Sequence, residues 1–254
     1  MTHPIELYFW PTPNGLKISI ALEEMALPYA LKPVNISAGD QFKPDFLKIS
    51  PNNRMPAIID PEGPGGAPIS VFESGAILQY LGRKTGKFYP GDERQRVAVE
   101  EWLFWQMANL GPATGQRGHF SVYAPKFVED PAQLAYAQKR FANEVDRLYG
   151  VLDRRLADNA FLAGEYSIAD MASWPWVNGA VRLAGPESVA AFPHLRAWLE
   201  RVGARPAVQK GAAVGAELRR AIPDMNKDEL NSTVKNLFGQ TAQSIADAAR
   251  ANAN

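Results

Sequence analysis

The chain has 254 residues, 46% of them hydrophobic and 21% charged, which is ordinary for a globular protein and excludes collagen-like, disordered and coiled-coil classes. Its 27 basic and 27 acidic residues cancel, so the overall charge favours neither nucleic acid nor an anionic membrane as a partner. The absence of cysteine excludes disulfides, protein thiolate nucleophiles and cysteine-ligated metal centres.

The three histidines are far apart and show no metal-ligand spacing, so no metal is expected. The sequence contains no run of 18 apolar residues and no basic segment followed by an apolar core at its start. We therefore expect a cytoplasmic protein.

Residues 1–87 predict short strands alternating with helices. Alternation of Ile5, Leu7 and Phe9 with polar or aromatic neighbours is typical of a strand with one buried face. The further predicted elements are a helix at 14–27, a strand at 29–36, a short helix at 42–49, strands at 57–60 and 69–72 around a turn, and a helix at 74–84. The order β-α-β-α-β-β-α predicts a small mixed four-stranded sheet.

The chain after residue 93 predicts helices only. Apolar stripes cover residues 99–110 and 134–156, and Gly111-Pro112 and the glycines of 115–118 are expected to interrupt the helical path. The S-x-x-D pattern at Ser167 to Asp170 predicts a capped helix start. We expect three parts: a first domain at 1–87, an all-helical domain at 94–222, and a C-terminal helical extension at 223–254. An N-x-x-E pattern from Asn226 marks the start of the helix in this extension.

The first candidate site lies between the opening strand and its helix, at Pro11 to Gly15. Free backbone N–H groups and the positive end of the helix dipole stabilise an anion there, and the side chains of Thr12 and Asn14 add donors. The alternative is a plain helix cap by Asn14.

The second candidate site is the turn from Asn52 to Ala57. The Met55–Pro56 bond is a candidate cis peptide, which would present the backbone of Met55 to an extended peptide as an added strand. The alternative is a trans proline that opens a strand.

The third candidate site is Phe72 to Gly75, at another helix start. Local N–H groups with Ser74 suit a carboxylate and Glu73 suits an ammonium, so together they could hold the head group of an α-amino acid. Capping alone explains Ser74 but not Glu73.

Together these segments resemble the glutathione S-transferase superfamily, and most closely its nu class, over about residues 5 to 215. The resemblance rests on P-T-P-N-G, S-P-N-N-R-M-P-A, F-E-S-G-A-I-L-Q-Y-L, W-L-F-W-Q, L-G-P and S-I-A-D, in that order. It implies a thioredoxin-like N-terminal domain, a helical-bundle C-terminal domain, a homodimer, and a glutathione site on the first domain.

The resemblance also implies roles for individual residues. Thr12 and Asn14 would lie near the glutathione sulfur, and Met55, before a cis-Pro56, would pair with the cysteinyl backbone. Glu73 and Ser74 would bind the γ-glutamyl head. The glycyl end or a second ligand would meet Gln41 and Arg54, with Arg140 as a further contact.

Nu-class proteins resemble one another in binding two glutathione molecules and reducing disulfides, and the missing cysteine fits that chemistry. A disulfide reductase without its own thiol needs one glutathione to attack and another to resolve the mixed disulfide. Donors that lower the pKa of the bound thiol by one unit would raise its reactive fraction several-fold.

Several aromatic and polar residues have both a structural and a functional interpretation. For Tyr8 we favour packing over activation of the thiol. Trp102, Phe104 and Trp105 are expected to form an aromatic band in the core before any role in lining an acceptor cleft. Gln116 and His119 could reach a second thiol pocket, although a loop position is the plainer interpretation of His119.

The leading prediction is a glutathione-dependent disulfide-bond reductase with transferase or peroxidase side activity, acting on a small or protein disulfide. The alternatives are glutathione conjugation to small electrophiles, a non-catalytic glutathione-binding regulatory protein, and an interaction module of a translation factor. No nucleic acid, membrane or metal is expected as a partner.

Overall fold

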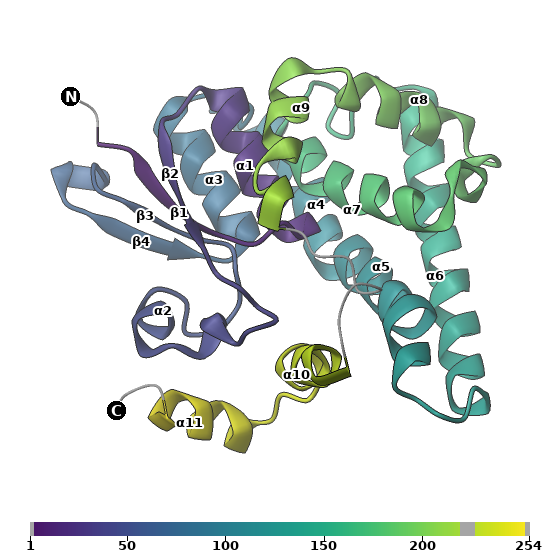
Figure 1. Cartoon of the computed structure of the whole chain (residues 1–254). Helices are drawn as coiled ribbons and strands as arrows, with labels where there is room; N and C mark the ends of the chain where they lie inside the picture. Colours follow the sequence, from purple (N-terminus) through teal and green to yellow (C-terminus); the bar gives the residue numbers. More distant parts are fainter. Residues whose placement is uncertain (1–2, 219–226, 252–254) are drawn as a thin grey trace. The chain divides into compact units, whose positions relative to one another are not determined.

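The computed structural model describes residues 3–218 and 227–251. The chain forms two compact units, one made of residues 1–77 with 210–254 and the other of residues 78–209 (Figure 1).

The first unit contains a four-stranded mixed sheet in the order β2-β1-β3-β4, which confirms the predicted fold class. Strand β1 pairs in parallel with β2 and antiparallel with β3, and β3 pairs antiparallel with β4. The elements, in chain order, are β1 (Ile5–Phe9), α1 (Pro13–Met25), β2 (Tyr29–Pro33), η1 (Asp40–Phe42), α2 (Pro44–Ile49), β3 (Ala57–Asp60), η2 (Pro64–Gly66), β4 (Ile69–Phe72) and α3 (Ser74–Thr85).

The alternation in β1 directs its side chains to two different faces of the sheet. Ile5, Leu7 and Phe9 are buried on one face, where a Cβ on Gly15 of α1 would lie 3.1 Å from the ring of Phe9. On the other face, Tyr8 packs against a core cluster that includes Phe46 of α2. Helices α1 and α2 therefore cover opposite faces of the sheet, as Figure 1 shows.

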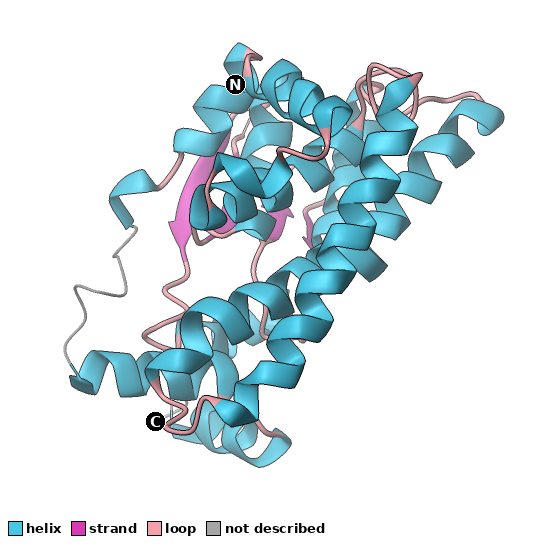
Figure 2. Ribbon diagram, turned by 90° about the vertical axis from the view of Figure 1, so that its right-hand side faces the viewer, coloured by secondary structure: helices cyan, strands magenta, loops and turns pink. Residues whose placement is uncertain are grey.

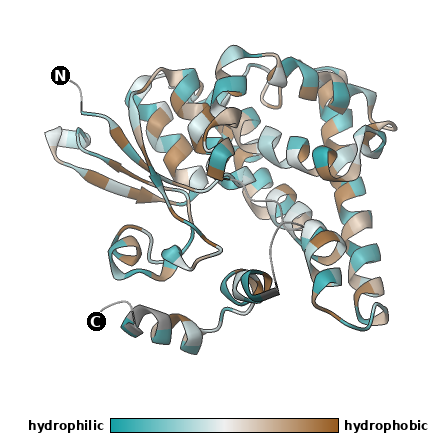
Figure 3. Ribbon diagram, viewed as in Figure 1, coloured by the Kyte–Doolittle hydropathy of each residue, from teal (hydrophilic) through white to brown (hydrophobic). Residues whose placement is uncertain are grey.

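The second unit is helical, and no strand follows Phe72 in the described residues apart from isolated bridges at 161–165 (Figure 2). Its elements are α4 (Glu93–Trp105), η3 (Gln106–Leu110), α5 (Gly111–Gly118), η4 (His119–Tyr123), η5 (Ala124–Lys126), α6 (Ala132–Ala157), α7 (Ile168–Ala184), η6 (Pro186–Val189) and α8 (Pro193–Gly203), with α9 (Pro206–Ala213) crossing into the first unit. Figure 3 shows hydrophobic and hydrophilic positions alternating along α6, whose apolar stripe is buried.

The predicted interruption at Gly111-Pro112 is wrong, because helical backbone continues from Glu93 to Tyr123. Before the proline, η3 is a π-helical turn in which the N–H of Gly111 donates to the carbonyl of Gln106. Pro112 then occupies the first turn of α5, where its missing N–H costs little. The predicted break at 115–118 is wrong as well, since these residues lie in α5.

The capping box predicted at Ser167 is confirmed. The Ser167 hydroxyl accepts from the N–H of Ala169, and the N–H of Ser167 donates to Oδ2 of Asp170. Oδ1 of Asp170 accepts from Nε1 of Trp198 at 2.8 Å and from the N–H of Leu162 at 3.1 Å. The fully buried carboxylate therefore joins α7, α8 and the segment before α7.

The C-terminal segment belongs to the first unit and contains η7 (Ala216–Leu218), α10 (Lys227–Phe238) and α11 (Ala242–Ala251). Asn226, the predicted start of this helix, lies outside the described residues. Asn236 donates to the carbonyl of Ser37 at 2.7 Å, and Nδ2 of Asn53 donates to Oε1 of Gln240 at 3.1 Å. The end of the chain is thereby fastened to two loops of the thioredoxin-like sheet.

None of the described helices is both long enough and apolar enough to cross a membrane.

Candidate functional site

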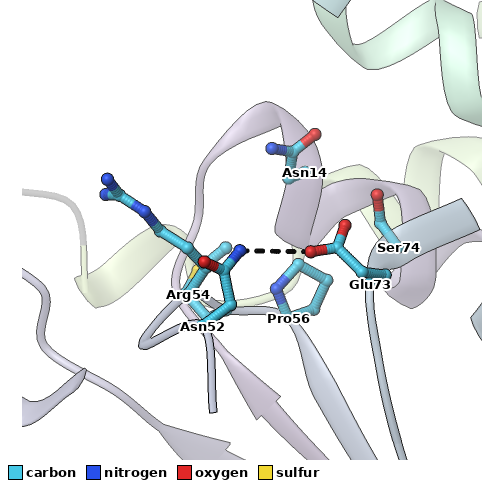
Figure 4. A pocket seen from close by; sticks show the side chains of 7 residues that line it. Asn14, Asn52, Arg54, Pro56, Glu73 and Ser74 are labelled. Atoms are coloured by element: carbon cyan, nitrogen blue, oxygen red, sulfur yellow. Dashed lines mark hydrogen bonds between the residues drawn. The ribbon is translucent and has the colours of Figure 1, made fainter. Parts of the chain in front are cut away.

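A pocket of about 270 Å³ opens on the first unit where α1, β3 and α3 begin. Its volume is near the lower end of the roughly 300–1,000 Å³ of small-molecule sites. Figure 4 shows it from close by. It is lined by Asn14, Asn52, Arg54, Met55, Pro56, Glu73 and Ser74. The pocket thus brings together residues from all three segments that the sequence singles out.

The first wall of the pocket is the N-terminus of α1. Thr12 is the N-cap of this helix, with its Oγ1 accepting from the N–H of Gly15 at 3.4 Å. The hydroxyl of Thr12 donates to Sδ of Met55 at 3.8 Å. A thioether is a weak acceptor, so the Thr12 hydroxyl can turn to a stronger acceptor such as a thiolate at small cost. Asn14, two residues on, lines the pocket itself.

The second wall is the turn that leads into β3. The Met55–Pro56 peptide bond is cis, which confirms the prediction. Met55 is buried in the cluster that packs between α2 and the sheet. In Figure 4 the guanidinium of Arg54 extends away from Glu73, so one rim of the pocket carries positive charge and the opposite rim negative charge.

The third wall is the turn between β4 and α3. Glu73 has a φ of 69°, a left-handed conformation that few non-glycine residues adopt and that is found preferentially at functional sites. Its Oε1 accepts from Nδ2 of Asn52 at 3.2 Å, a bond drawn in Figure 4. Its carbonyl accepts from the N–H of Ile77, so the strained residue also starts α3.

A lysine lies behind this wall. Lys17 sits one turn after Asn14 on α1, is only 1% exposed, and donates from Nζ to Oγ of Ser74 at 3.3 Å. Burial lowers the pKa of Lys17 to about 7, and the nearby charge of Glu73 opposes this shift. The lysine was missed in the sequence analysis, although it lies in a helical run of apolar residues, Leu16 to Leu22, in which a charged side chain is unexpected.

Three predicted site residues do not line the pocket: Gln41, Arg140 and Thr12, of which Thr12 donates to the lining residue Met55. The side chain of Gln41 is 1% exposed and its Nε2 donates to the carbonyls of Ile36 and Asn236. Arg140 lies on α6 of the second unit, where its guanidinium is 3.6 Å from the carboxylate of Glu144. Their roles toward a ligand therefore stay predictions.

The residues with two interpretations differ in their surroundings. The hydroxyl of Tyr8 donates to Oε2 of Glu6 at 3.0 Å, and burial raises the pKa of Tyr8 to about 12. Trp102 and Trp105 form an edge-to-face pair, but Phe104 is 60% exposed, so its predicted place in the core is wrong. Gln116 is exposed, and His119 lies in η4 rather than in a loop, where it contacts the ring of Phe120 and burial lowers its pKa.

Metal chemistry finds no support in the described ranges, where no three His, Asp or Glu side chains gather as a ligand set. The polar groups of the pocket are instead amides, a hydroxyl, a carboxylate and a guanidinium. Such a set suits an organic ligand that carries both an ammonium and carboxylates.

The chain is similar to known proteins over most of its length. Residues 3–83 match the family model described as the N-terminal domain of glutathione S-transferase, and residues 117–206 match its C-terminal domain. One relative is the protein named disulfide-bond oxidoreductase YfcG of Escherichia coli, 49% identical over 205 residues, which are 80% of this chain and 92% of that protein.

Two solved structures share the fold. A glutathione transferase from Pseudomonas putida, with one glutathione disulfide bound per subunit, has a TM-score of 0.77 and 43% identity over 83% of this chain and 91% of its own. A glutathione transferase from Burkholderia graminis, with two glutathione molecules bound per subunit, has a TM-score of 0.78 and 42% identity over 83% and 88% of the respective chains. With both domain models matched and relatives of this identity, the chain belongs to the glutathione S-transferase family.

Proposed function

We propose that this protein is a glutathione-dependent disulfide-bond reductase of the nu class that uses two bound glutathione molecules. The observation that carries the proposal is the pocket between the start of α1 and the turn of Glu73 and Ser74, in a chain that has no cysteine. Such a protein can catalyse thiol–disulfide exchange only between sulfur atoms of its bound ligands. The names and bound ligands of the relatives support the same conclusion.

The γ-glutamyl head of one glutathione binds at the turn between β4 and α3. Its ammonium pairs with the carboxylate of Glu73, and its α-carboxylate accepts from Ser74 and from N–H groups at the start of α3. The cysteinyl backbone pairs with Met55 before Pro56, as an added strand. This orientation directs the cysteinyl sulfur toward the start of α1.

Thr12 and Asn14 stabilise the thiolate at that position. The hydroxyl of Thr12 changes its acceptor from the thioether of Met55 to the negatively charged sulfur. Asn14 positions the sulfur, and the positive end of the α1 dipole favours its negative charge. Arg54, which lines the pocket, serves the glycyl carboxylate or the second glutathione.

The reaction proceeds in two thiol–disulfide exchanges. The first glutathione thiolate attacks one sulfur of the substrate disulfide, forms a mixed disulfide, and releases one substrate thiolate, which takes up a proton. The second glutathione thiolate attacks the glutathione sulfur of the mixed disulfide and releases the other substrate thiolate. One substrate disulfide is reduced to two thiols while two glutathiones are oxidised to glutathione disulfide.

The test compares two assays on the same preparation. Reduction of a small disulfide is followed through the glutathione disulfide produced, and conjugation is followed with a chloronitrobenzene acceptor. We expect disulfide turnover to dominate, with calorimetry giving two glutathiones or one glutathione disulfide per subunit. Strong conjugation without disulfide turnover would support the transferase alternative instead, and binding without either reaction would support a regulatory protein.

We propose that the enzyme is a cytoplasmic homodimer. Val97 and Phe104 on α4 are 42% and 60% exposed, and apolar side chains of this kind are commonly covered by a second subunit. Light scattering after size-exclusion chromatography is expected to give twice the 27.9 kDa of one chain. A monomer at micromolar concentration would refute the dimer without affecting the proposed reaction.

A further inference from the structure

We propose that Lys17 is a positioning residue of the pocket, whose Nζ holds the hydroxyl of Ser74 from behind and selects ligands that carry a carboxylate at that point. The inference rests on the proposed glutathione site and assigns to it a group that does not itself line the pocket.

The geometry places the lysine in a second layer. Lys17 donates from Nζ to Oγ of Ser74 at 3.3 Å, and Ser74 lines the pocket. A hydroxyl that accepts from an amine on one side directs its own proton elsewhere, so this bond orients Ser74 as a donor. The Lys17 side chain is 1% exposed, and its stem is surrounded by buried residues of α1. Ser74 is therefore held in one orientation before any ligand arrives.

One charged group is found to act on Lys17. Glu73, in the turn between β4 and α3, is the group whose negative charge acts on the lysine. On α1 itself, the next acidic side chain along the helix, Glu23, is engaged by Lys210 at 2.8 Å and by the hydroxyl of Tyr29. Glu73 is proposed to bind the ammonium of the ligand without moving, so the carboxylate of the ligand adds a second negative charge near Lys17.

The added carboxylate has a consequence for the protonation of Lys17. Burial lowers the pKa of Lys17 to about 7, so at pH 8 most molecules hold a neutral amine there. A carboxylate placed against Ser74 favours the ammonium form and raises the pKa again. Ligand binding at pH 8 therefore takes up a proton, and affinity falls as pH rises from 7 to 9.

The experiment uses S-methylglutathione, because this ligand has no ionisable thiol and proton uptake cannot come from its sulfur. Calorimetry at pH 8 in two buffers of different ionisation enthalpy measures the protons taken up. We expect more than about half a proton per molecule for the parent protein. The variant Lys17→Gln keeps a donor for Ser74 without a titratable charge, and Lys17→Met removes both. Both are expected to abolish the uptake, while Lys48→Met, at an exposed lysine, leaves it unchanged.

A second ligand tests the recognition itself. An analogue in which the γ-glutamyl residue is replaced by γ-aminobutyrate lacks the α-carboxylate. We expect the parent protein to bind it at least ten-fold more weakly than S-methylglutathione, and Lys17→Met to bind the two within about two-fold. In turnover, Lys17→Met should raise KM for glutathione while kcat at saturation changes less than about two-fold, with melting curves confirming that the variants fold.

The outcomes separate the two proposals. If the parent protein binds S-methylglutathione without proton uptake, or if Lys17→Gln retains the uptake, the role of Lys17 is refuted and the glutathione site stands. If neither glutathione nor its S-methyl derivative binds, the proposed function itself is refuted, and the role of Lys17 is refuted together with it.

Discussion

The amide of Asn52 donates to the carboxylate of Glu73 at 3.2 Å, and so joins the turn before β3 to the turn before α3. The sequence pattern predicts a binding role for Glu73 but only a turn position for Asn52. The bond fixes a carboxylate whose backbone is already strained, with a φ of 69°. The glutamate is thus held in position for an incoming ammonium before the ligand binds.

Glu73→Gln is expected to weaken glutathione binding by about 1.5–3 kcal/mol, the usual worth of a hydrogen bond to a charged group. Calorimetric titration measures the effect. Asp45→Asn is a matched control, because it also removes one acidic charge from this unit but at an exposed ion pair on α2. Unchanged affinity in Glu73→Gln would remove this residue from the γ-glutamyl site.

Thr12→Ala is expected to lower disulfide turnover roughly ten-fold, with a smaller effect on glutathione affinity, because loss of the donor would raise the pKa of the bound thiol by about one unit. Since Thr12 is also the N-cap of α1, the same change should cost about 1 kcal/mol of stability. Thr12→Ser keeps both the cap and the donor and should retain turnover and stability. Equal losses in the two variants would argue against a role for the hydroxyl.

The buried amine of Lys17 predicts a pH dependence of stability. Its pKa falls from the usual 10.5 in the unfolded chain to about 7 in the folded one. Between these values the unfolded chain binds more protons, so the free energy of unfolding rises with pH, by up to about 1.4 kcal/mol per unit. Urea titrations from pH 7 to 9 should show this rise for the parent relative to Lys17→Met. Parallel pH profiles for the two proteins would contradict it.

Asp170→Asn is expected to destabilise the helical unit by about 2–4 kcal/mol. The buried carboxylate accepts from Trp198, Leu162 and Ser167, and an amide would present a donor to one of these donors. Urea denaturation followed by tryptophan fluorescence measures the loss. Asp158→Asn, just after the end of α6, serves as a control and should be nearly neutral.

Removal of residues 227–254 is expected to speed amide hydrogen exchange in the loop of residues 35–43. Asn236 and Gln240 fasten this loop and the Asn53 turn, and Gln41 donates to the carbonyl of Asn236. Mass spectrometry of peptides from this loop reports the change, with peptides of α6 as the internal reference. Identical exchange in both proteins would show that the extension does not restrain the loop.

The sequence predicted the thioredoxin-like sheet well, because its signals are local. The two-residue period of Ile5, Leu7 and Phe9 and the prolines and glycines of the hairpin determine their elements without distant contacts. Strands β3 and β4 have the predicted bounds, Ala57–Asp60 and Ile69–Phe72. The break predicted at Gly111-Pro112 does not occur, because the π-helical turn η3 accommodates Pro112 without ending the helix. A π-helical turn has no sequence signal of its own.

The sequence predicts the residues of the candidate site that lie in short motifs. It does not predict the residues that come together only when the chain folds. Asn14, Met55 and Glu73 belong to short motifs that mark the starts of helices and strands. Lys17 becomes relevant only because α1 brings it against Ser74, 57 residues later in the chain. The engagement of Gln41 by Asn236 spans 195 residues, which no local pattern encodes.

The first unit is assembled from both ends of the polypeptide, residues 1–77 and 210–254. During synthesis the strands that carry the pocket leave the ribosome first, yet Gln41, Asn53 and Ser37 find their partners only after the final helices have been made. A chain that terminates after the helical half would therefore lack the hydrogen bonds that residues 236 and 240 make with the loops of the sheet. The thioredoxin-like sheet of this protein therefore gains its last contacts only after residues 236–240 have been synthesised.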